Sequence, residues 1–275
     1  NTRVDGETGV KVLESWGRVQ EDLDACGTSL LRIAKEDKEL AALLECPGSD
    51  ENEDFARQAA LAIKTVNDIV ERIDRLEALT PYLKGLGARC AHFGGKPRHF
   101  DVLDTALTGM LEAHLGNEWT VQLQAAWTVA FEAVRAIMVP ALEQAMREKA
   151  AIDLIQGTWK KIEPYKEAHG VKMMIKLFEI DPEISGLFSF DDDEGPLQRN
   201  DKFRNHAKTV MVAIGEAVML MSDVDSLVKK LRSLGSKHAG LAVTPEHWNS
   251  FGQAFMWMVQ QALKKEWSPE VAQGW

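Results

Sequence analysis

Hydrophobic residues recur every three or four positions along most of the chain, which is the spacing of one face of an α-helix. One such stripe consists of Phe55, Ala59, Ala62, Val66, Ile69 and Ile73. A later stripe with the same spacing consists of Phe203, His206, Val210, Ile214 and Val218. No segment shows four clean alternations of β-branched and polar residues, so strands are not expected. Glycine and proline interrupt the stripes where loops are needed. The pattern therefore predicts an all-α fold.

The sequence also repeats itself. From residue 55 to residue 127, adding 148 to a position leads to a matching position in the second half. Nearer the start of each copy the offset is 143, as for Trp16 and Trp159. The difference of five residues falls in a loop that contains Glu45–Asp54 in the first copy and Asp191–Glu194 in the second. Identical pairs at the offset of 148 are Phe55 and Phe203, Leu86 and Leu234, Gly87 and Gly235, Met110 and Met258, Glu118 and Glu266, Trp119 and Trp267, and Trp127 and Trp275.

A repeat of about 148 residues has the size of a whole domain. We therefore expect two domains, at residues 1–148 and 149–275. The segment Ala141–Trp159 is rich in strong helix formers, so the last helix of the first copy is expected to run directly into the first helix of the second. The second copy stops at Trp275, the counterpart of Trp127, and so we expect it to lack most of its last helix.

The composition of the chain limits the classes of partner that it is expected to bind. The 275 residues are 45% hydrophobic and 27% charged, which is ordinary for a globular protein. The net charge of −10 argues against binding to nucleic-acid phosphates. Apolar stretches such as Ala217–Met221 are far shorter than the ~20 residues of a membrane span, so no membrane partner is expected. Three cysteines argue against a disulfide framework and leave both a cytoplasmic and an extracellular location open. A homo-oligomer is compatible with these features.

Two histidines stand on apolar stripes of the second copy. His206 lies one turn before Val210, and His238 ends the stripe of Leu227, Leu231 and Leu234. Each alone is most simply a hydrogen-bonded core histidine. As a pair on facing helices they suit coordination of a flat group between those helices. Zinc would need two further ligands, and no cysteine or histidine cluster supplies them. A haem needs only one or two axial ligands from the protein.

The second copy resembles the globin family, and within that family the neuroglobin-like globins. The residues that carry the resemblance are Asp181, Pro182, Glu183, Leu187, Phe188, Phe203, His206, Val210 and the run Leu234–His238. The resemblance implies at least one haem b per chain, with dioxygen or another diatomic molecule as ligand. It makes His238 the proximal haem ligand, His206 the distal histidine, and Phe188 the phenylalanine packed on the haem. His206 would hydrogen-bond the diatomic ligand or bind the iron itself. The other implied pocket residues are Met174, Val210, Leu234 and Val243.

The first copy departs from the globin pattern in its pocket. Gln58 stands at the distal position, Cys90 at the proximal one, and Leu44 or Glu45 at the place of the haem-packing phenylalanine. Three interpretations stay open: a buried Cys90 in a haem-free domain, haem held by the Cys90 thiolate, or haem held by His92. The last requires a local shift, because residues two apart on a helix point about 200° apart.

The favoured function is reversible dioxygen binding for storage or transport, placed ahead of enzymatic turnover. The alternatives are a haem-based redox or gas sensor, a globin that processes peroxide or nitric oxide, and an interaction module in which the first copy scaffolds the second. The histidines with polar neighbours are interpreted as surface residues, namely His99, His114, His169 and His247.

Overall fold

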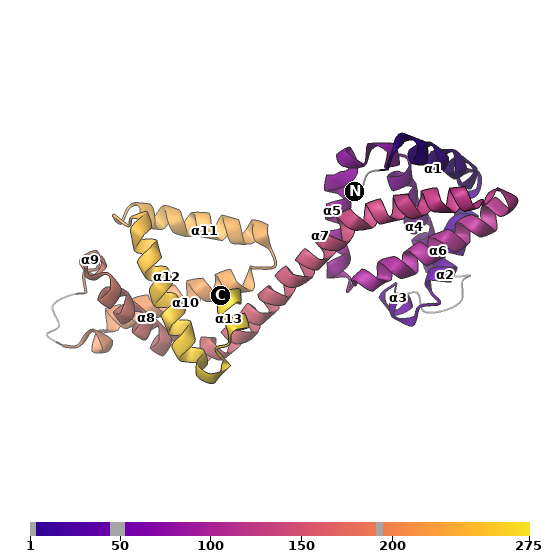
Figure 1. Cartoon of the computed structure of the whole chain (residues 1–275). Helices are drawn as coiled ribbons and strands as arrows, with labels where there is room; N and C mark the ends of the chain where they lie inside the picture. The colour runs from indigo at the N-terminus through magenta and orange to yellow at the C-terminus, as the bar shows by residue number, and fades with distance from the viewer. Residues whose placement is uncertain (1–3, 45–52, 191–194) are drawn as a thin grey trace. The chain divides into compact units, whose positions relative to one another are not determined.

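The computed structural model describes residues 4–44, 53–190 and 195–275, and every regular element in this part of the chain is helical (Figure 1). The chain divides into two compact units, unit 1 at Asn1–Arg147 and unit 2 at Glu148–Trp275. This division falls within one residue of the expected domain boundary. The loops predicted to contain the five-residue difference lie mostly outside the described residues.

The helices follow one another with short connections. Unit 1 contains α1 (Gly6–Val19), α2 (Leu23–Ala34), α3 (Lys38–Leu43), α4 (Glu53–Val70), α5 (Leu76–His92), α6 (Pro97–Leu115) and the first part of α7 (Val121–Ile162). Unit 2 contains the rest of α7 and then α8 (Lys166–Ile180), α9 (Pro182–Ser185), α10 (Asp201–Met219), α11 (Val224–Ala239), α12 (Pro245–Leu263) and α13 (Pro269–Gly274). Short polar side chains accept hydrogen bonds from the first-turn N–H groups of several helices and so mark their starts. These caps are Asp5, Asp22, Asp37, Asn200, Asp223 and Ser268.

The sequence repeat is a repeat of helices. The starts of α4, α5 and α6 lie 148 residues before the starts of α10, α11 and α12, whereas α2 starts 143 residues before α8. The turns that follow α6 and α12 also match, because Gly116 and Lys264 adopt the same left-handed backbone, with φ of 52° and 50°. The all-α prediction and the change of offset are thus reflected in the positions of individual helices.

The two units share one close helix crossing, at equivalent positions of the repeat, that requires glycine. A Cβ atom on Gly27 of α2 would lie 2.7 Å from the carbonyl oxygen of Ala59 on α4. A Cβ on Gly170 of α8 would lie 2.6 Å from the carbonyl oxygen of Ala207 on α10. Any larger residue would push the two helices apart, so glycine sets the spacing at which α4 and α10 present their side chains.

A tryptophan indole joins two segments of each unit in the same way. The Trp127 indole N–H of α7 donates to the Ser15 hydroxyl of α1 at 3.1 Å. The Trp275 indole N–H donates to the Thr158 hydroxyl of α7 at 3.0 Å. A buried indole N–H is costly without a partner, so both units satisfy it across the same helix contact.

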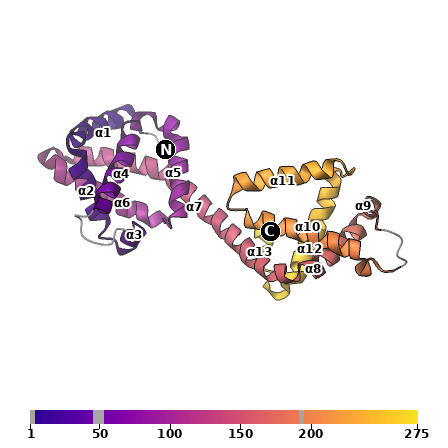
Figure 2. The same cartoon turned by 180° about the vertical axis from the view of Figure 1, so that it is seen from behind.

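The two units differ at the helix that carries Cys90 or His238. In unit 1, α5 buries Leu79, Leu83 and Ala91 in a core cluster with Met138 of α7. In unit 2, α11 has no buried residue, and both views show it to one side of the bundle formed by α8, α10 and α12 (Figures 1 and 2). The described parts of unit 2 therefore cover the apolar stripe of α11 only in part.

Helix α7 runs without a break from Val121 to Ile162, as predicted for Ala141–Trp159. By length and composition, the helical stretch Val121–Ile180 is apolar enough to cross a membrane. The expectation that no apolar stretch is long enough to span a membrane is wrong by this criterion of length and composition. Core helices of globular proteins meet the same criterion, and Trp127 and Leu142 are buried inside unit 1.

Candidate functional site

His238 lies in the last turn of α11 with one ring nitrogen engaged. Its Nδ1 is 2.9 Å from the carbonyl oxygen of Leu234, one turn earlier. Because a carbonyl oxygen only accepts, Nδ1 carries the proton and donates, which leaves the lone pair of Nε2 free. The half-buried ring also packs edge-on against Trp248, with centroids 5.1 Å apart. These contacts fix the tautomer and the ring direction, as they do for metal-binding histidines.

His206 lies on α10, half-buried, with Phe188 beside it. The two rings meet edge-to-face with centroids 5.1 Å apart. Burial lowers the pKa of His206 below its usual value, and the charge of nearby His238 lowers it further. His206 is therefore neutral near pH 7, the form that binds a metal or donates a single hydrogen bond.

The remaining predicted residues of unit 2 lie on several elements. Met174 is buried in the core on α8, and Val210 packs against that core from α10. Leu234 is half-buried and contributes its carbonyl oxygen to His238. Val243 is half-buried just before α12. The structure thus brings Phe188 to His206 directly, whereas Met174 belongs to the packed core.

At the predicted site, the described part of unit 2 offers His206, His238 and exposed apolar side chains of α11. Leu231 of α11 is 48% exposed and Val224 is 65% exposed. Among the described residues, no three histidine, cysteine, aspartate or glutamate side chains cluster as metal ligands. A closed tetrahedral zinc site is thus not formed by these residues. A separate cavity of about 440 Å³ beside Trp159 and Gly215 contains none of the predicted site residues.

Unit 1 has a larger cavity, of about 930 Å³, which is partly open to solvent. Gln58 of α4 and Cys90 of α5, the predicted distal and proximal residues, both line it. Most other lining residues are apolar and come from α4, α5, α6 and α7. Examples are Val66, Leu86, Phe100, Phe131 and Met138.

The unit 1 cavity has the size of a small-molecule site, since ligand pockets are commonly about 300–1,000 Å³ in volume. It is partly open to solvent and lined mostly by apolar side chains. These two features make it a candidate binding site.

Cys90 is poorly prepared to ligate a metal. Burial raises the pKa of its thiol, while the metal-binding form is the thiolate. Helix α5 continues in regular form to His92, whose exposed side chain lies at the cavity, so no local shift brings His92 to the register of Cys90. Leu44 also lines the cavity, and Glu45 lies outside the described residues.

A model of the globin family matches residues 47–138, in unit 1, and residues 171–275, in unit 2. The chain belongs to the globin family. Its fold is all-α, with two globin folds in tandem.

Several relatives share this likeness over one globin domain. A neuroglobin from Tetraodon nigroviridis is 32% identical over 126 residues, which is 45% of this chain and 79% of the relative. A neuroglobin from Chaenocephalus aceratus matches to the same extent. A protein named anaerobic nitrite reductase HBII from Casuarina glauca is 30% identical over 126 residues, which is 44% of this chain and 79% of the relative.

His99 is a residue of the unit 1 globin site that the sequence analysis missed. It is only 3% exposed, so its interpretation as a surface histidine is wrong. Its Nδ1 accepts the Lys96 backbone N–H at 3.1 Å, which places the proton on Nε2. His99 lines the same cavity, and its buried Nε2 has no hydrogen-bond partner among the described residues. Glu39, at 3.8 Å, is too far for a hydrogen bond.

The signal that could have identified His99 is the helix cap. His247 accepts the Thr244 backbone N–H in the same way at the start of α12. His99 and His247 are 148 residues apart, and each lies three residues after the residue that caps its helix. A side chain that reaches back to the cap residue is held close to the helix start and away from solvent.

Gln58 has an unpartnered atom as well. Its Nε2 donates to the carbonyl oxygen of Leu44 at 2.6 Å, which ties α4 to the end of α3. Its Oε1 is buried with no partner among the described residues. Two lining residues of one largely apolar cavity therefore carry unpartnered polar atoms of opposite sense, an acceptor on Gln58 and a donor on His99.

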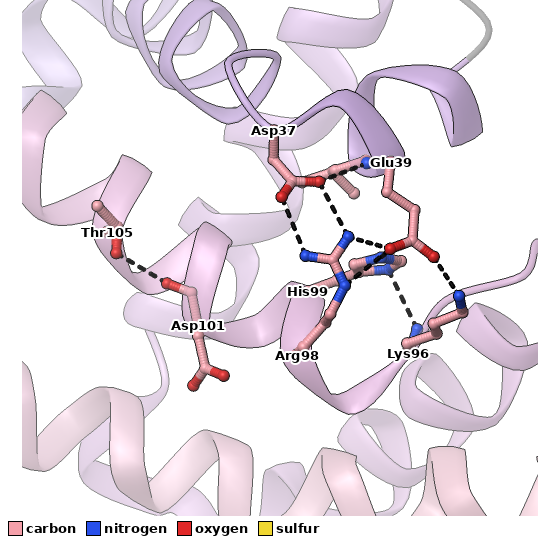
Figure 3. A network of polar contacts seen from close by, with 8 residues as sticks. Asp37, Glu39, Lys96, Arg98, His99, Asp101 and Thr105 are labelled. Carbon is pink, nitrogen blue, oxygen red and sulfur yellow. Dashed lines mark hydrogen bonds and ion pairs between the residues drawn. The ribbon is translucent and has the colours of Figure 1, made fainter.

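A charged network joins α3 to the start of α6 beside His99. Figure 3 shows the Arg98 guanidinium between Asp37 and Glu39, with Lys96 reaching Glu39 from the other side. Arg98 donates to Asp37 at 3.0 Å and to Glu39 at 2.8 Å. The hydrogen bond from Lys96 and those from Arg98 lower the pKa of Glu39 to about 2, and Arg98 lowers the pKa of Asp37 to about 2. This network positions the two helix starts at the edge of the cavity.

Proposed function

We propose that unit 2 binds haem b through His238 and thereby binds dioxygen or another small diatomic ligand reversibly. The observation that carries the proposal is the 2.9 Å bond from His238 Nδ1 to the Leu234 carbonyl oxygen, which aims a free Nε2 lone pair away from its own helix. Haem supplies an iron that binds diatomic gases, and the protein supplies the axial nitrogen and the surrounding pocket.

His206 takes the distal role in this proposal. A neutral imidazole has one N–H, which donates to a ligand that carries partial negative charge. If the same ring binds the iron itself, it competes with external ligands and lowers their apparent affinity by the fraction of open sites. The Phe188 ring, whose centroid lies 5.1 Å from that of the His206 ring, restricts the rotation of the imidazole in either case.

The apolar residues keep water from the site. Phe188, Val210 and Leu234 are half-buried next to the two histidines in sequence or in space. Met174 and Val243 complete the proposed wall from α8 and from the turn before α12. The exposed stripe of α11 supports this arrangement, since a large flat apolar group between α10 and α11 would cover it.

We further propose that unit 1 binds no haem, so the chain holds one haem. The protonated thiol of Cys90 and the regular helix through His92 support this. Cys90→Ala is expected to leave the haem-to-chain ratio and the optical spectrum unchanged. A changed spectrum would reject a haem-free unit 1.

The direct test is the haem-to-chain ratio with ferric, ferrous and carbonyl spectra of the reconstituted chain. We expect one haem per chain, and no retained haem in His238→Ala. His169→Ala removes another histidine of the same unit and serves as the control. A full Soret band in His238→Ala would refute the assignment of His238. A low-spin ferrous spectrum that His206→Leu converts to high-spin would identify iron ligation by His206.

Nitrite reduction is a second candidate. It is favoured by the likeness to the Casuarina glauca protein named anaerobic nitrite reductase HBII and by the neutral donor His206. Repeated turnover of nitrite by the haem-loaded chain in the presence of excess external reductant, lost in His238→Ala, would support this candidate over reversible binding.

A further inference from the structure

The unit 1 cavity is apolar over most of its lining, yet two of its lining residues, Gln58 and His99, each carry a buried polar atom without a partner among the described residues. Gln58 Oε1 accepts and His99 Nε2–H donates, and neither has a partner among the described residues. His99 is 3% exposed, so its N–H is cut off from bulk water. A buried donor or acceptor is rarely left unpaired in a native protein, and these two point to a ligand that satisfies them.

The charged residues at the cavity are already paired. Arg135 lies 2.6 Å from Asp101 and 2.7 Å from Asp104. Lys96 is paired with Glu39. An anionic or cationic ligand would face only neutralised pairs here, and its buried charge would lack a counter-ion. The cavity therefore favours a neutral ligand.

We propose that the unit 1 cavity binds a neutral, largely hydrocarbon molecule bearing a hydroxyl group, anchored by Gln58 and His99. A hydroxyl donates to an amide oxygen and accepts from an imidazole N–H, so it serves both unpartnered atoms. The hydrocarbon body replaces water along the apolar lining from α4, α5 and α7. This inference rests on the part of the proposed function that keeps haem out of unit 1.

The test is calorimetric titration of the full, haem-loaded chain with three probes that share an unbranched ten-carbon chain: 1-decanol, its methyl ether 1-methoxydecane, and decanoate. 1-Decanol is expected to bind about tenfold more tightly than 1-methoxydecane, because the ether cannot donate to Gln58 Oε1. Decanoate, ionised at pH 7.5, is expected to bind more weakly than 1-decanol. Equal affinities for the alcohol and the ether would overturn the role of the two polar atoms and show that water serves them.

Substitutions at residues that line the unit 1 cavity test whether the probes bind there. Gln58→Leu is expected to abolish the preference for the alcohol over the ether, and Ala62→Phe, which fills the cavity, to abolish binding of all three probes. His99→Phe removes the second anchor, and His247→Phe removes the same helix cap from unit 2 as its control. Binding that persists in Ala62→Phe would overturn the proposal.

The two proposals fail separately. A second haem per chain, lost in Cys90→Ala, would overturn the ligand proposed for unit 1 and leave the role of His238 intact. Decanol binding to a chain that takes up no haem would overturn the haem proposal for unit 2 alone.

Discussion

Residues 90 and 238 occupy the same place in the repeat, and the side chains there give the two units different chemistry. His238 has one nitrogen engaged by a carbonyl and the other free, whereas burial keeps the Cys90 thiol protonated. The distal positions differ less, because Gln58 and His206 both carry a hydrogen-bond donor. The proximal residue, more than the distal one, therefore separates the two units.

Replacing His206 tests its distal role. In the haem-loaded chain, His206→Leu removes the N–H that would donate to the diatomic ligand. Because such a bond is worth about 1–3 kcal/mol, the dioxygen dissociation rate is expected to rise about tenfold to a hundredfold. Stopped-flow displacement by carbon monoxide measures this rate. Lys208→Ala, on an exposed face of α10, is the control, and an unchanged rate in His206→Leu would contradict the distal role.

The individual site residues were predictable from the sequence to different degrees. His206 and His238 could be found because they interrupt apolar stripes. His99 was missed because its neighbours in sequence, Arg98 and Asp101, are charged, and its burial comes from α3, which lies about 60 residues earlier in the chain. Burial created by distant segments leaves no local pattern for the sequence to reveal.

At the scale of helices, the two units share a crossing that only glycine allows. Gly27→Ala and Gly170→Ala each place a methyl group within 2.7 Å of a carbonyl oxygen, so α2 and α8 must move away from their partners. We expect each substitution to lower the free energy of unfolding by about 1–3 kcal/mol. Gly157→Ala in α7 is the control, since a Cβ there meets nothing within 4 Å. Denaturant unfolding followed by circular dichroism measures the change, and unchanged stability would show that the crossing adjusts freely.

The charged network between α3 and α6 predicts a pH-dependent effect. The pKa of Asp37 and that of Glu39 both lie near 2 in the folded chain, below the usual value of about 4. These carboxylates therefore stabilise the fold above about pH 4, and the contribution is lost as the pH falls toward 2. Arg98→Gln is expected to lower the Tm of unit 1 slightly at pH 6, with the difference vanishing near pH 2. Calorimetry over this range, with exposed Lys64→Gln as control, measures it. A difference that persists at pH 2 would mean that Arg98 acts through packing instead of charge.

Helices α5 and α11 occupy equivalent positions in the repeat, but they do not pack against the same neighbour. A Cβ on Gly87 of α5 would lie 2.4 Å from the carbonyl oxygen of Met138 on α7, whereas Gly235 of α11 has nothing within 4 Å. The sequence predicted both helices from one repeated pattern, and both exist. Their packing could not be read from that pattern, because it depends on which segments lie against them.

The partly covered α11 predicts fast amide exchange. Few buried contacts hold this helix, so in the haem-free chain its amides should exchange faster than those of α12, which belongs to the packed core. Haem that binds His238 should slow exchange in α11 selectively. Hydrogen exchange measured by mass spectrometry, with and without haem, tests both statements. Equal protection of α11 and α12 without haem would contradict them.

At the scale of the whole molecule, the repeat in the sequence predicted two globin folds, and the division of the chain into two compact units follows the same plan. The offsets of 148 and 143 could be read directly from matched residues, because insertions in loops leave helices intact. The 930 Å³ cavity of unit 1 could not be predicted from the sequence, because a cavity forms only when several helices are assembled and leaves no mark on any one apolar stripe.

Thermal unfolding of the full chain distinguishes the two units. A ligand that binds only the folded form of one unit raises the stability of that unit by about 4 kcal/mol when its concentration is a thousandfold above its Kd. Haem is therefore expected to raise the Tm of the transition that Gly170→Ala lowers, and 1-decanol the Tm of the transition that Gly27→Ala lowers. Differential scanning calorimetry of the parent and both variants assigns each transition to its unit. If haem raised the Tm of both transitions equally, either the two units would unfold as one cooperative body or each unit would bind haem. The haem-to-chain ratio distinguishes these two explanations.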